Sequence, residues 1–142
     1  MSIFQKFIES REDDANIPAN AKEAKREIQI VANDSLGTKI NGFGIEEINF
    51  ELIDFEEAKQ GIQLNMEAKG PAIAKSKQHI SSMLQKLSRR CREPLWKKKI
   101  FLDFMYHQID VTENVVENDD NTPIGLKKTL YFTVICAAIV FR

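Results

Sequence analysis

The sequence predicts an α+β domain in which helices pack on one face of an antiparallel sheet of about four strands. Residues 48–52 and 62–69 alternate apolar and polar side chains with a period of two, which is typical of half-buried strands. Residues 73–91 place apolar side chains at three- and four-residue spacings, which indicates an amphipathic helix. The final run, 130–141, is apolar except for Thr133 and is rich in aromatic and β-branched residues, which favour a strand.

The length and composition are those of one ordinary globular domain. The chain has 142 residues, of which 43% are hydrophobic and 29% charged, so it can bury a single adequate core. A polar stretch at 12–18 interrupts the pattern near the start. We therefore expect an N-terminal helix with its polar connection over 1–18 and a single α+β domain over 19–142.

The N-terminal half begins with two expected helices. Residues 2–11 form a short amphipathic pattern in which Ser2 is the N-cap, and its apolar face comprises Ile3, Phe4, Phe7 and Ile8. The apolar spacing predicts a second helix over about 19–33, with Gly37 just beyond its end. Residues 27–31 are also compatible with a strand.

The middle of the chain predicts a hairpin followed by a helix. The connection 54–61 is short enough to join strands 48–52 and 62–69 in antiparallel fashion. We expect Gly70 and Pro71 to end the second strand and to open the helix, since proline suits the first helical position. Pro94 is expected to stop that helix.

The C-terminal part predicts two further strands. Residues 100–111 read as a strand, 117–125 as a turn-rich loop, and 130–141 as a closing strand. A run of about a dozen apolar residues is too short for a membrane-spanning helix. Its continuous apolarity predicts that both faces of this strand are covered, the second face either by the two N-terminal helices or by another subunit. The expected order is α-α-β-β-α-β-β, and its ββαβ part resembles a split ferredoxin-like arrangement, which many functions share.

No catalytic, metal or cofactor site is predicted. His79 and His107 have no second ligand at metal spacing on the same element. The glycines of 41–44 precede a strand instead of joining a strand to a helix, so we expect them to form a turn and not a phosphate loop. Cys91 and Cys136 are expected to be reduced, because two cysteines do not make a disulfide scaffold.

Charge is sorted along the chain although the net charge is only −1. Residues 75–99 carry nine basic side chains and one acid, whereas 46–57 carry six acids and no base. The densest basic segment predicts an interaction surface for phosphates or for acidic segments. Its residues are Lys86, Arg89, Arg90, Arg92, Trp96, Lys97, Lys98 and Lys99.

These patterns favour a non-enzymatic protein-interaction or assembly module, expected to be a homo-oligomer or part of a larger complex. The alternative is binding of nucleic acid or another anionic surface through 86–99, where Trp96 could stack on a base. A third reading is a small enzyme whose site is assembled from dispersed residues. The N-terminus lacks the pattern of a signal peptide, and no stretch is long enough to span a membrane, so we expect a cytoplasmic protein.

Overall fold

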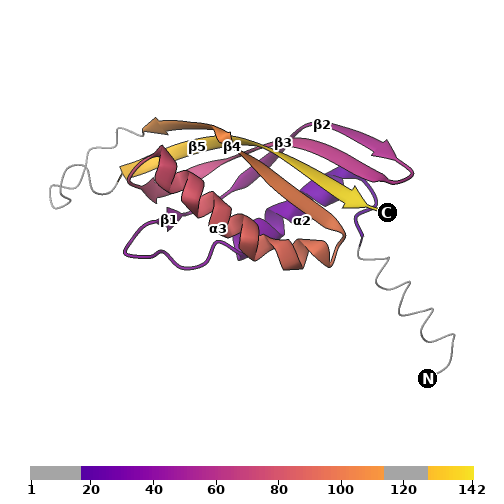
Figure 1. The fold of residues 1–142 in the computed structure, drawn as a ribbon, viewed down its shortest axis with the longest axis horizontal. Helices are drawn as coiled ribbons and strands as arrows, with labels where there is room; N and C mark the ends of the chain where they lie inside the picture. The colour runs from indigo at the N-terminus through magenta and orange to yellow at the C-terminus, as the bar shows by residue number, and fades with distance from the viewer. Residues whose placement is uncertain (1–16, 114–127) are drawn as a thin grey trace, which may run out of the picture.

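The structure is a computed structural model that describes residues 17–113 and 128–142. Its elements follow one another as shown in Figure 1. In chain order they are α2 (Ala21–Asp34), β1 (Gly44–Ile45), β2 (Asn49–Ala58), β3 (Gly61–Ala74), α3 (Lys77–Trp96), β4 (Ile100–Glu113) and β5 (Lys128–Phe141). The expected helix 2–11 and the expected loop 117–125 lie outside the described residues.

The five strands form one antiparallel sheet, with β2, β3, β5 and β4 side by side and the two-residue β1 also paired with β3. Because β3 and β4 are both antiparallel to β5, they are parallel to each other, and α3 connects them. This is a split β-α-β unit with β5 inserted between its strands. Both α2 and α3 lie on the same face of the sheet (Figure 1). The predicted class and helix placement are therefore confirmed, with one short strand more than expected.

Helix α2 confirms the helical interpretation of residues 27–31. Asn20 caps its first turn, with its side-chain oxygen accepting from the Glu23 N–H at 2.9 Å. Its buried residues recur at helical spacings along one side: Ala21, Ala24, Ile28, Val31 and Ala32.

The side-chain amides of Gln29 and Asn33 tie α2 to the start of β2. The Asn33 amide donates to the Ile48 carbonyl oxygen at 2.8 Å and accepts from the Ile48 N–H at 3.2 Å. The Gln29 amide donates to the same carbonyl at 2.6 Å and accepts from the Phe50 N–H at 2.7 Å. These two side chains satisfy the backbone groups of Ile48, just before β2, and the N–H of Phe50 in β2.

Strand β3 overturns the prediction that Gly70 and Pro71 end a strand and open a helix. β3 continues through both residues to Ala74, and Ser76 caps α3 instead, accepting from the His79 N–H at 3.2 Å. The Pro71 carbonyl accepts from the Glu46 N–H, between the stretches of β3 that pair with β1 and β2. In a strand, the nitrogen and the carbonyl oxygen of one residue point to the same side. The nitrogen of Pro71 therefore points to the side on which neither β1 nor β2 pairs with it, and its missing N–H costs no hydrogen bond of the sheet.

Pro94 does not stop α3, which is a second correction. The helix continues two residues beyond it, to Trp96. A proline so near the end removes only one helical hydrogen bond. The chain turns into β4 at Lys99, which adopts a left-handed φ of 60°.

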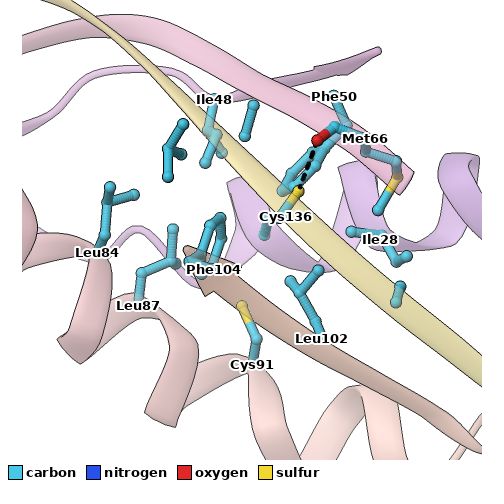
Figure 2. Close-up of a cluster of buried hydrophobic side chains, with 14 of the residues drawn as sticks. Ile28, Ile48, Phe50, Met66, Leu84, Leu87, Cys91, Leu102, Phe104 and Cys136 are labelled. Carbon is cyan, nitrogen blue, oxygen red and sulfur yellow. Dashed lines mark hydrogen bonds between the residues drawn. The ribbon is translucent and has the colours of Figure 1, made fainter. Parts of the chain in front are cut away.

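The prediction that helix 19–33 covers the second face of the closing strand is wrong, because α2 and α3 both lie on the other face, and cover by another subunit stays a prediction. The side chains of β5 alternate strictly between buried and more exposed along the described residues. The buried set joins the core formed with α2 and α3, where Figure 2 shows Phe104, Met66 and Cys136 together. The buried β5 residues are Leu130, Phe132, Val134, Cys136, Ala138 and Val140.

Candidate functional site

The outer face of β5 is an uncharged stripe that neither α2 nor α3 covers. Of its apolar members, Tyr131 is 48% exposed, Phe141 42% and Ile139 37%. A contiguous row of apolar side chains on the surface of a small domain marks an interaction site more often than scattered single ones do. We call this row the outer stripe: Tyr131, Thr133, Ile135, Ala137, Ile139 and Phe141.

The outer stripe widens at the C-terminal end of β5. Phe101 of β4 is 48% exposed and lies opposite Ile139 in the sheet register. The Trp96 ring is half exposed and packs edge-on against Phe141, with ring centroids 5.7 Å apart. The ammonium of Lys99 lies 5.4 Å from the centroid of the Trp96 ring. Trp96 therefore lies outside the core and extends the exposed apolar surface.

Charged side chains border the outer stripe in a defined register. Thr133 pairs with Lys69 of β3 on one side and with Asp110 of β4 on the other. Ala137 pairs in the same way with Asn65 and Asp103. An apolar centre with a charged rim is the usual anatomy of a protein–protein interface.

The basic segment 86–99 lies on α3 and on the turn that follows it. Arg89 and Lys97 are exposed and help to line a broad groove of about 740 Å³ between α2 and α3, in which Glu93 is the single acid. Arg90 reaches back to α2 and donates from Nη1 to the Leu36 carbonyl at 2.8 Å. Lys98 forms an ion pair with Glu27 at 3.2 Å. The structure thus brings Arg89, Arg90, Lys97 and Lys98 together at this groove, whereas Lys86 lines a separate cavity and Arg92 lies beside the start of β4.

The acidic segment 46–57 does not meet the basic segment among the described residues. Its ion pairs go to two lysines outside 86–99, Lys39 with Glu46 at 2.8 Å and Lys69 with Glu51 at 3.1 Å. Both pairs are well exposed to solvent and contribute little stability. The charged side chains of both segments are therefore largely exposed to solvent.

The two cysteine thiols are poorly placed to act as nucleophiles. Both thiols are buried and unpaired, and burial raises the pKa of Cys91 and raises that of Cys136 to about 12, so neither is a ready nucleophile. The Cys136 thiol donates to the Met66 carbonyl oxygen at 3.7 Å (Figure 2).

Within 17–113 and 128–142, no three acidic, histidine or cysteine side chains are grouped as metal ligands. The helices of the described part are too short or too polar to cross a membrane.

The comparisons with known proteins leave the chain without a family. No protein-family model matches it, and no curated protein does. It is similar to a solved structure titled the type 4 fimbrial biogenesis protein PilO from Pseudomonas aeruginosa, with 12% identity over 98% of this chain and 87% of that one. The TM-score of this match is 0.41, so it carries no argument about the present chain.

Proposed function

We propose that this chain is a non-enzymatic protein-interaction module that forms a two-fold dimer through the outer stripe. The observation that carries the proposal is the uncharged, half-exposed row along β5, bordered by charges of opposite sign. Lys69 stands on one side of Thr133 and Asp110 on the other. An isologous interface needs a surface that complements itself, and this row has that property.

The direction of the two-fold axis follows from the register. An axis along β5 turns the second molecule so that its β4 lies over β3 of the first. Asp110 of each molecule then faces Lys69 of the other, which makes two equivalent opposite-charge contacts around an apolar centre. The strands of the two sheets remain nearly aligned, as in most face-to-face sheet packings.

The other possible axis, across the strands, is disfavoured by charge. This axis places β4 of one molecule over β4 of the other. When the axis passes through Ile135, Asp110 of one molecule lies near Asp103 of the other. Like charges facing each other at an interface oppose association. The charges therefore favour a parallel alignment of the two β5 strands.

Light scattering coupled to size exclusion tests the dimer. We expect the unmodified chain to elute at twice its mass of 16.3 kDa. The variant Ile139→Asp should be monomeric, because a carboxylate within the outer stripe loses its water without gaining a partner, which weakens association by roughly a hundredfold or more. A charge exchange, Lys69→Asp combined with Asp110→Lys, should dimerise more tightly than either single variant.

The matched control is Ile53→Asp, which introduces the same charge at an isoleucine that is 54% exposed on β2, away from the outer stripe. It should leave the dimer unchanged, and circular dichroism should show that every variant is folded. A monomeric unmodified chain at its solubility limit would overturn the proposal, as would equal effects of the two aspartates.

The second candidate function is binding of an anionic polymer through the basic segment 86–99. It is favoured by the groove between α2 and α3, where Arg89, Lys97 and Lys98 stand beside Glu93. The half-exposed Trp96 immediately precedes Lys97 and supplies an aromatic face of the kind on which bases stack.

Fluorescence anisotropy with a labelled single-stranded oligonucleotide tests this second candidate. The double variant Arg89→Ala, Lys97→Ala should bind more weakly, and the slope of log affinity against log salt should fall by roughly 1.4, about 0.7 for each lost phosphate contact. Arg90 is left in place because it holds the Leu36 carbonyl. Absence of binding by the unmodified chain at low salt would remove this candidate.

A further inference from the structure

A cavity of about 250 Å³ lies between the chain segment that precedes β1 and the N-terminal half of α3. Its wall on the loop side is a tight turn in which Ile40 and Phe43 exchange backbone hydrogen bonds of 2.9 and 3.0 Å. Asn41 and Gly42 both have positive φ, as a two-residue hairpin turn requires. The expected role of these residues in a turn is thereby confirmed, and the wall is locally well defined.

The inside of the cavity is apolar. Leu36, Ile45, Met83 and Leu87 contribute to its lining, and Leu87 and Ile45 belong to the buried core. An apolar cavity of roughly 150 Å³ is already sufficient to bind benzene in a protein interior. The cavity is thus large enough for a small ring or a short alkyl chain.

The rim of the cavity is cationic. Lys75, Lys86 and Arg90 line it, and its lining contains no acidic side chain. None of the ion pairs among the described residues involves these three cations. The Arg90 guanidinium is fixed in place by the Leu36 and Ser35 carbonyls, and both bonds leave from Nη1.

His79, which also lines the cavity, lies close to the positive charges of Lys75 and Lys86. Its pKa is lowered by desolvation and by the nearby charges of Lys75 and Lys86, so the imidazole is neutral at pH 7. Its Nδ1 accepts from the Lys75 N–H at 3.1 Å, which leaves the proton of the neutral ring on Nε2. The neutral ring adds a donor, and not a further charge, to the cavity lining.

We propose that this cavity binds a small carboxylate with an apolar body, its apolar part against Met83 and Leu87 and its carboxylate toward Lys75 and Lys86. Apolar walls with a few charged groups at one side are typical of small-molecule sites. The site lies on the helical side of the molecule and is independent of the outer stripe.

The probes are benzoate, benzyl alcohol and benzylammonium, which share one ring and differ in charge. Each is titrated into the full chain while the Met83 methyl resonance is followed by NMR. We expect benzoate to bind roughly tenfold more tightly than benzyl alcohol, since hydrogen bonds to a charged group are about twice as strong as neutral ones. Benzylammonium should bind least well, because its charge matches that of the rim.

The variants Lys75→Gln and Lys86→Gln should each lose most of the preference for benzoate over benzyl alcohol. Lys59→Gln is the matched control, since it removes the same charge from the connection between β2 and β3. Equal affinities for benzoate and benzyl alcohol in the unmodified chain would overturn the proposal. So would a benzoate preference that survives both substitutions, or the absence of a saturable Met83 shift with any probe.

Discussion

Gly70→Ala is expected to lower the free energy of unfolding by about 3 kcal/mol or more, as measured by urea denaturation. A Cβ at Gly70 would fall 1.9 Å from the carbonyl oxygen of Glu47 and 2.9 Å from its carbonyl carbon. These are backbone atoms, so no side chain can rotate away to make room. The chain that leads into β2 passes directly over Gly70, and a methyl group would push the two segments apart.

Gly44→Ala is the matched control for this effect. A Cβ there would meet the Lys39 side chain first, at 3.1 Å, and a long flexible side chain can shift by a few tenths of an ångström. We expect a loss of less than about 1 kcal/mol. Similar losses for the two variants would show that the crossing over Gly70 is looser than the structure describes.

The same crossing explains why sequence reasoning misplaced the end of β3. Glycine followed by proline is a local turn signal, and a helical pattern begins soon afterwards. Both residues contact a segment that is distant in the sequence. Gly70 leaves room for the backbone of Glu47 because it has no side chain, and Pro71 lies where its missing N–H costs no hydrogen bond of the sheet. Periodicity predicted β2 and α3, and aromatic and β-branched content predicted β4. The predicted connection 54–61 is wrong, because β2 runs on to Ala58.

The outer stripe could be predicted only in part. The continuous apolarity of 130–141 predicted that both faces of this strand are covered, whereas the described residues cover one face only. The sequence predicted that the helices share one face of the sheet, but it could not show that this arrangement leaves the outer face of β5 uncovered by α2 and α3, since that depends on how β5 inserts between β3 and β4. The register that sets Lys69 and Asp110 on either side of Thr133 is equally non-local, so neither residue was a candidate from sequence.

Gln29→Leu combined with Asn33→Leu is expected to cost more stability than the sum of the two single substitutions. Both amides donate to the Ile48 carbonyl, so this oxygen keeps one donor in either single variant and loses both in the double variant. Each single variant also removes one acceptor, from Phe50 N–H or Ile48 N–H. An unsatisfied backbone group that is at least partly buried costs about 1–3 kcal/mol.

A double-mutant cycle in urea measures this coupling, with each single substitution expected to cost about 1–2 kcal/mol and the coupling to add about 1 kcal/mol more. Asn65→Leu is the control, because it breaks an exposed side-chain bond to Asp54 of 2.6 Å and should change stability by less than about 0.5 kcal/mol. Strict additivity would mean that water replaces the lost amides at Ile48. A positive coupling would show that side chains of α2 replace a neighbouring strand as hydrogen-bond partners for the backbone at the start of β2. The segment 27–31, which is compatible with helix and strand alike, is then helical while its Gln29 side chain pairs with the backbone of a strand.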